Sequence, residues 1–155
     1  MKRKSPLNRL SKKRSAEKKT YKEAWTKQDL RTLEDNEGVI PCSSCGVTVA
    51  VRTHAREYKT VIPWGHSHNM SVKHYQDLES DPNNFKPRCQ DFGFHKGCHE
   101  ALDYPDFSRI KNFIDLDQIM EYRKEHSIEE YNKFVSGLKA AGCDDYDYIG
   151  HEDNC

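Results

Sequence analysis

Four cysteines near the middle of the chain constrain its fold more than any other feature. Cys42 and Cys45 form a C-x-x-C pair that is followed directly by Gly46, and Cys89 and Cys98 come much later in the chain. A C-x-x-C turn directs two thiolates at one ion, and a second pair can complete a tetrahedral site. The sequence therefore predicts a structural zinc (Zn²⁺) site that ties two distant segments together.

The fourth ligand of this site is open to two interpretations. The segment QDFGFHKG separates Cys89 from Cys98, and it is longer than the usual spacer of about two to four residues. His95 lies inside the segment and is an alternative to Cys98. The predicted zinc ligands are Cys42, Cys45, Cys89 and Cys98, with His95 in place of Cys98 as the alternative.

The composition favours a metal-stabilised fold. Of the 155 residues, 35% are hydrophobic and 32% are charged, so the core is small and a metal would offset part of the entropy lost on folding. We find no apolar run long enough for a membrane span and no secretory signal pattern, and we expect no membrane partner. We therefore expect a cytoplasmic location, where reduced cysteines favour metal binding over disulfides.

The formal net charge of zero hides a strong asymmetry. Residues 1–31 contain twelve Lys or Arg and three acidic residues, whereas the remainder contains thirteen and twenty-two. Such a basic segment is typical of nucleic-acid contact, because neutralising phosphates releases counterions, although a solvated basic tail has the same composition. The residues predicted to contact nucleic acid are Lys12, Lys13, Arg14, Lys18, Lys19, Lys22 and Trp25.

Hydrophobic periodicity predicts helices at both ends of the chain. The first twenty residues are predicted to form a flexible arm, and a helix follows as far as about residue 33. Near the other end, Asp115 is a predicted N-cap, and Ser127 with Glu130 forms a capping box for a second helix that Gly142 ends. Short β-branched stretches on either side of residue 55 predict strands, and residues 65–84 are predicted to form a loop.

These patterns divide the chain into four parts. We assign a basic arm and helix to residues 1–36, the cysteine-containing core to residues 37–105, a helical pair to residues 106–142 and a loose acidic tail to residues 143–155. The tail contains Cys143 and Cys155, which are predicted to be free thiols or, with His151, to form a minor metal site.

The order of motifs over residues 20–105 resembles one family. A basic helix with Tyr21 and Trp25 precedes the C-x-x-C-G motif at Cys42; Gly65-His66 follows, and then an N-x-x-x-x-C motif that begins at Asn84. This order is similar to that of the HNH (ββα-metal) endonucleases, and most similar to the NinG-type phage recombination nucleases. The resemblance implies a small α+β protein with a zinc-stapled ββα-metal core, an N-terminal basic helix and C-terminal helices.

The resemblance also implies an activity. It implies metal-dependent hydrolysis of phosphodiester bonds in double-stranded or branched DNA, in phage recombination or DNA processing, and in the host cytoplasm if the protein is phage-encoded. His66 would be the general base, which suits an imidazole, and His99 would bind a catalytic cation, Mg²⁺ or another divalent ion. Asn84 would orient the loop or approach the metal, and His68 is the alternative base.

The sequence also departs from the family pattern. Many HNH enzymes have an acidic residue directly before the catalytic histidine, but this chain has Gly65, so a carboxylate ligand is missing or comes from Asp91 or Asp103. A His-x-x-Pro register would place Thr60 at the position of the base. The alternative function is therefore a catalytically inactive, zinc-stapled nucleic-acid-binding module.

Overall fold

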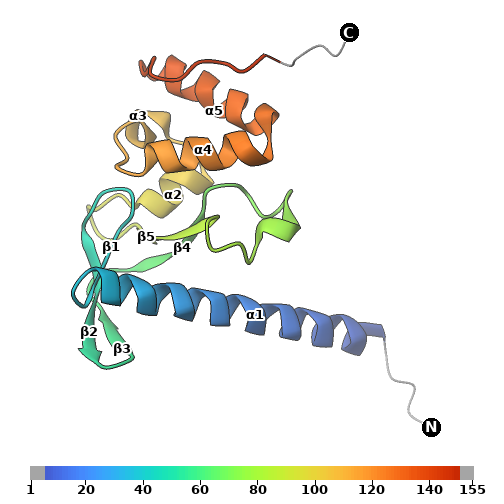
Figure 1. The fold of residues 1–155 in the computed structure, drawn as a ribbon, viewed down its shortest axis with the longest axis vertical. Helices are drawn as coiled ribbons and strands as arrows, with labels where there is room; N and C mark the ends of the chain where they lie inside the picture. Colours follow the sequence, from blue (N-terminus) through green and yellow to red (C-terminus); the bar gives the residue numbers. More distant parts are fainter. Residues whose placement is uncertain (1–5, 151–155) are drawn as a thin grey trace.

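The computed structural model describes the backbone of residues 6–150 and the side chains of residues 19–150. It is a small α+β fold built from one long helix, two small antiparallel sheets and four shorter helices (Figure 1). The elements are α1 (Pro6–Asp35), β1 (Val39–Pro41), β2 (Thr48–His54), β3 (Glu57–Thr60), β4 (Trp64–His68), a 3₁₀ turn (Gln76–Leu78), β5 (Phe85–Cys89), α2 (Cys98–Asp103), α3 (Phe107–Ile110), α4 (Leu116–His126) and α5 (Ile128–Ala140).

Helix α1 is longer than the sequence predicts. The prediction of a flexible arm over the first twenty residues is wrong for residues 6–20, because α1 begins at Pro6 and runs without a break to Asp35. Lys, Arg, Glu and Leu are good helix formers even without an apolar face, and proline fits the first helical position. Residues 1–5 lie outside the described part of the chain.

A β-hairpin occupies the space between α1 and α2. Strands β4 and β5 pair antiparallel with His66 opposite Pro87, and α2 packs against both strands. Figure 1 shows α1 on one side of this hairpin and α2 on the other. The loop predicted for residues 65–84 therefore begins later than expected, since residues 64–68 form a strand whose Gly, His and Ser residues do not show the usual β-branched signal.

The two stretches predicted to form strands contain the three strands of the sheet β1–β2–β3, with the first cysteine pair between β1 and β2. β1 pairs with β2, and β2 pairs with β3, both antiparallel. The hydrophobic core joins this sheet to α2 and to helices α3, α4 and α5, and its fully buried side chains include Leu33, Ile40, Val49, Ile119 and Leu138.

The C-terminal helices begin where the sequence predicts. The Ser127 hydroxyl accepts a hydrogen bond from the Glu130 backbone nitrogen at the start of α5, which confirms the predicted cap. Asp115 occupies the N-cap position of α4, but its side chain makes no capping bond. It binds Arg88 instead, because a buried guanidinium without an anionic partner would cost more free energy than a missing helix cap.

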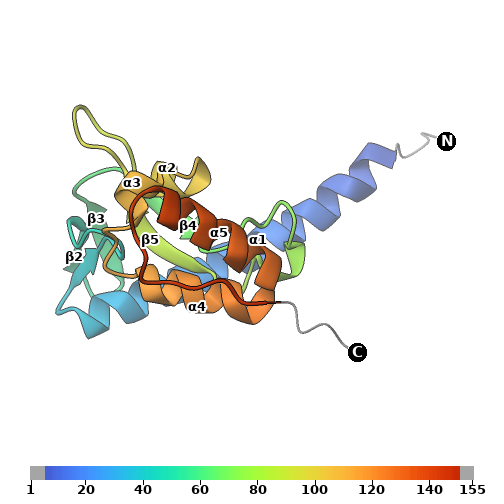
Figure 2. The same ribbon diagram turned by 90° about the horizontal axis from the view of Figure 1, so that it is seen from above.

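The described part of the acidic tail is not loose. Cys143 is buried, and the Asn132 side chain bonds both the backbone nitrogen and the backbone oxygen of Ile149. Figure 2 shows this segment running back along α4 and α5. Cys155 and His151 lie outside the described residues. None of the helices within residues 6–150 combines the length and the apolar character needed to cross a bilayer.

Candidate metal centre and histidine site

The four predicted cysteines come together at one point. The sulfur atoms of Cys42, Cys45, Cys89 and Cys98 all lie within 4.8 Å of one another. The turn after β1 supplies the first pair, β5 ends at Cys89, and α2 begins at Cys98. Gly46 follows the first pair with φ 76°, a left-handed conformation that favours glycine. This cluster could hold a metal ion such as zinc, because four thiolates are a tetrahedral donor set.

The thiols of the cluster influence one another strongly. Hydrogen bonds from Cys89 and Cys98 lower the pKa of Cys42. The hydrogen bond to Cys42 raises the pKa of Cys89 to about 12, and the corresponding bond raises the pKa of Cys98. Cys42 therefore ionises readily, and its negative charge disfavours ionisation of Cys89 and Cys98. A bound cation offsets this repulsion, so the donor set suits a divalent metal.

His95 touches the cluster without being needed to complete it. Its Nε2 atom lies 3.2 Å from the sulfur of Cys89, and the backbone nitrogen of Cys98 lies 3.4 Å from the same sulfur. Cys98 already contributes its sulfur to the group of four. The geometry therefore favours Cys98 as the fourth ligand, with His95 hydrogen-bonding to a ligand sulfur.

His66 is held from the side of α1. Its ring stacks on Trp25 with centroids 4.7 Å apart and an interplanar angle of 12°. Its Nε2 atom lies 2.8 Å from Oδ1 of Asp29, whose side chain is 2% exposed. The other carboxylate oxygen, Oδ2, accepts a hydrogen bond of 2.9 Å from the hydroxyl of Tyr58.

These contacts fix the hydrogen-bonding state of His66. An ionised carboxylate only accepts hydrogen bonds, so in a neutral His66 ring the hydrogen lies on Nε2 and the lone pair on Nδ1. Burial and the neighbouring charge of Asp29 raise the pKa of Tyr58 to about 12, which keeps the tyrosine a donor. The arrangement leaves Nδ1 as the atom of His66 that can accept a proton.

His99 lies on the other side of β4. Its Nε2 atom is 3.9 Å from the point that a Cβ atom on Gly65 would occupy, and its Nδ1 atom is 3.6 Å from Oδ2 of Asp103. Successive strand residues point to opposite faces, so His66 and His99 lie on opposite faces of the strand at Gly65. Within residues 6–150, β4 pairs with β5 alone, so its other edge has no partner strand.

The histidines do not form a ready-made second metal site. Among the described side chains, the four cysteines are the only group of three or more His, Cys, Asp and Glu residues close enough to share an ion. Of the two alternative carboxylates, Asp103 is beside His99, whereas Asp91 accepts a hydrogen bond from the Gly97 backbone nitrogen at 2.6 Å.

Asn84 organises the loop between β4 and β5. Its side chain is fully buried, its Oδ1 accepts from the Met70 backbone nitrogen at 2.8 Å, and its Nδ2 donates to the carbonyls of Met70 and Leu78. Of the two roles predicted for Asn84, these contacts fit the orientation of the loop. Nearby, Nε2 of His68 is buried without a hydrogen-bond partner, and burial lowers the pKa of this histidine.

The predicted nucleic-acid residues share α1 but differ in surroundings. Lys19 and Lys22 are exposed, whereas Trp25 uses one ring face to stack on His66. The side chains of Lys12, Lys13, Arg14 and Lys18 lie outside the described residues. Sequence reasoning missed Asp29, although its spacing of four from Trp25 places both residues on one helix face.

Comparison with protein-family models, with curated proteins and with solved structures finds no match to this chain.

Proposed function

We propose that this protein is a metal-dependent DNA endonuclease of the HNH type. The observation that carries the proposal is the hydrogen bond between His66 and Asp29, because it orients an imidazole with Nδ1 available to take a proton from water. A buried imidazole needs a hydrogen-bond partner in any fold, and here that partner is a carboxylate that also fixes the orientation of the ring. Such an arrangement is typical of a positioned general base.

The surrounding elements support this proposal. The chain passes from a strand with Gly65-His66, through a loop organised by Asn84, into a second strand and then into a helix with His99. This is the order of elements that the HNH resemblance implies. The cysteine cluster has four protein ligands, so its proposed zinc ion is structural and leaves no open position for chemistry.

The proposed catalytic cation would bind at His99. Magnesium commonly keeps several waters and is held by one or two carboxylates together with substrate phosphate, so the site would need an oxygen ligand such as Asp103, whose Oδ2 lies 3.6 Å from Nδ1 of His99. The cation would neutralise charge on the phosphate. A Cβ atom on Gly65 would lie 3.9 Å from Nε2 of His99 and 3.3 Å from Nε2 of Gln90, so the Gln90 side chain shares this space and a phosphate would have to displace it.

A nicking assay tests the proposed activity. Supercoiled plasmid and a branched duplex should be cut when Mg²⁺ or Mn²⁺ is present. They should not be cut when a chelator removes these ions but leaves the zinc bound. His66→Ala should bind DNA as the wild type does and lose cutting by about 100-fold or more. His74→Ala, in the loop after β4, is the matched histidine control. Equal cutting by wild type and His66→Ala rules out His66 as the base.

A second candidate is a zinc-stapled nucleic-acid-binding module without catalysis. It is favoured by the 9% exposure of the His66 side chain beneath α1 and by the lack of a carboxylate at Gly65. This candidate predicts DNA binding that no divalent cation converts into cutting. The nicking assay separates the two candidates, because only the endonuclease produces cut DNA that depends on His66.

A further inference from the structure

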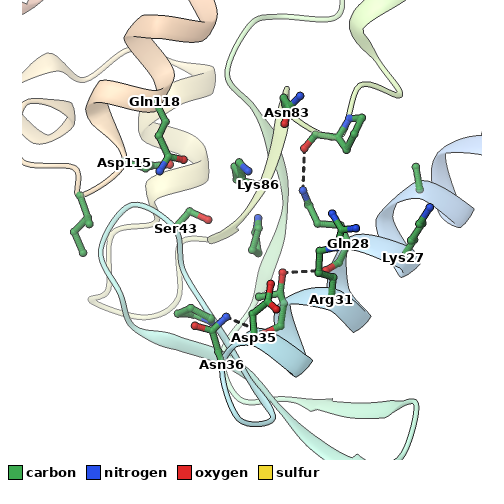
Figure 3. Close-up of a pocket in the computed structure, with 16 residues that line it drawn as sticks. Lys27, Gln28, Arg31, Asp35, Asn36, Ser43, Asn83, Lys86, Asp115 and Gln118 are labelled. Atoms are coloured by element: carbon green, nitrogen blue, oxygen red, sulfur yellow. Dashed lines mark hydrogen bonds between the residues drawn. The ribbon is translucent and has the colours of Figure 1, made fainter.

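A groove lined by both apolar and charged side chains runs along the side of α1 that faces β5 and the start of α4. It encloses about 660 Å³, and the residues that line it come from α1, from the loop around Ser43, from β5 and from α4 (Figure 3). None of the histidines or cysteines of the site lines the groove, so it is a separate feature of the surface.

Three cationic side chains line this groove. Lys27 and Arg31 are exposed and lie one turn apart on α1, and Lys86 comes from β5. Within the described residues none of the three has a hydrogen-bond or ion-pair partner. Cations that share one hollow repel one another, so the groove attracts an anion.

Lys86 is the most informative of the three. It is half-buried, and burial together with the charge of Arg88 lowers its pKa. The two acids nearest to it already have partners: Asp115 binds Arg88 at 2.6 Å, and Asp81 accepts a hydrogen bond from Tyr122 at 2.6 Å. A half-buried ammonium without its own anion costs stability, which is the pattern of a residue retained for a ligand.

We propose that this groove binds the phosphate backbone of a nucleic-acid strand. Lys27 and Arg31 on α1 and Lys86 on β5 supply the charge, and the side-chain amides of Asn83, before β5, and Gln118, on α4, supply neutral donors from the other elements around the groove (Figure 3). Proteins commonly bind backbone phosphates through such cationic and amide groups, and these contacts do not depend on the base sequence. The acids in the groove are Asp35 at one end and Asp115, which is paired with Arg88.

The groove deepens the proposed function, and it rests on that function in taking DNA as the partner. Helix α1 also holds His66 through Asp29, so a strand bound along α1 would be held at a fixed position relative to the histidine site. The groove thus adds a second set of phosphate contacts to those predicted for the exposed lysines of α1.

Fluorescence anisotropy of a labelled duplex, measured over a series of KCl concentrations without divalent cations, tests the groove. Lys86→Met should weaken binding about fivefold, and the slope of log affinity against log salt should fall by about 1. Lys124→Gln, an exposed lysine of α4 outside the groove, is the charge-matched control and should change neither quantity. The double variant Lys27→Gln with Arg31→Gln should give a larger loss.

Stability separates the groove from a folding defect. Lys86→Met should unfold at the same temperature as wild type or at a higher one, because it removes a half-buried charge while keeping most of the apolar stem. Weaker binding by a fully folded Lys86→Met variant supports the groove. Equal effects of Lys86→Met and Lys124→Gln, or no effect of either, overturn it. A wild type that binds through the groove but never cuts contradicts the endonuclease and leaves the groove intact.

Discussion

The Nε2 atom of His66 lies 2.8 Å from Oδ1 of Asp29, and this contact joins strand β4 to helix α1. The two residues are far apart in the sequence, and each belongs to a different part of the fold. Because Tyr58 donates a hydrogen bond to the other oxygen of Asp29, both oxygens of the carboxylate have a partner. His66 is therefore oriented by the tertiary structure and not by its own strand alone.

We predict that His66 is the tautomer with hydrogen on Nε2. Nitrogen-15 NMR of histidine-labelled protein should show a protonated Nε2 and an unprotonated Nδ1 for this residue near neutral pH. Asp29→Ala should remove this preference and reduce DNA cutting by about 10-fold to 100-fold. Glu34→Gln, an exposed acid of α1, is the control and should leave both measurements unchanged. An unprotonated Nε2 in the wild type would contradict the orientation of the base.

The buried Arg88 should contribute strongly to stability. Its side chain is fully buried and bonds Asp115, Ser44, Asn69 and the carbonyl of Ser67. Asp115→Ala should lower the free energy of unfolding by about 3 to 5 kcal/mol, because it leaves a buried guanidinium without its anion. Urea denaturation measures this loss, and Glu125→Ala, an exposed acid of α4, is the control. A loss of less than about 1 kcal/mol would show that the network tolerates the unpaired charge.

Metal content should depend on Cys98 and not on His95. Purified protein should contain one zinc ion per chain, and Cys98→Ser should lose the ion and unfold at a lower temperature, because metal binding contributes to folding. His95→Ala should keep the ion, since four cysteine sulfurs already lie within 4.8 Å of one another. Elemental analysis with thermal melting checks both variants. Retention of zinc by Cys98→Ser together with its loss from His95→Ala would reverse the assignment of the fourth ligand.

His68 should make stability depend on pH. Burial lowers its pKa below the ordinary histidine value of 6.5. The unfolded chain therefore binds the proton more readily, so this contribution to stability is fully present above about pH 6.5 and is lost as the pH falls towards the folded-state pKa. The free energy of unfolding should fall from about pH 7.5 to about pH 5.5 by less in His68→Gln than in the wild type. Identical pH profiles would show that His68 is not the source.

The sequence predicts local features of this protein better than contacts between distant elements. The C-x-x-C pair predicts its half of the cluster because a short turn builds it, and the capping box at Ser127 is entirely local. By contrast, the bond between Asp29 and His66 depends on where α1 crosses the hairpin. Asp115 is the clearest example of a contact that the sequence does not predict. It is at the predicted cap position, but its carboxylate binds Arg88, a buried arginine of β5.

Anomalous X-ray diffraction of crystals grown with Mn²⁺ and DNA tests the central claim most directly, because it locates each metal without relying on activity. We expect a zinc peak among Cys42, Cys45, Cys89 and Cys98 and a separate manganese peak next to Nε2 of His99, with a DNA phosphate at the Gly65 edge. A zinc peak alone, with DNA bound away from His66 and His99, would contradict the endonuclease and leave the binding module.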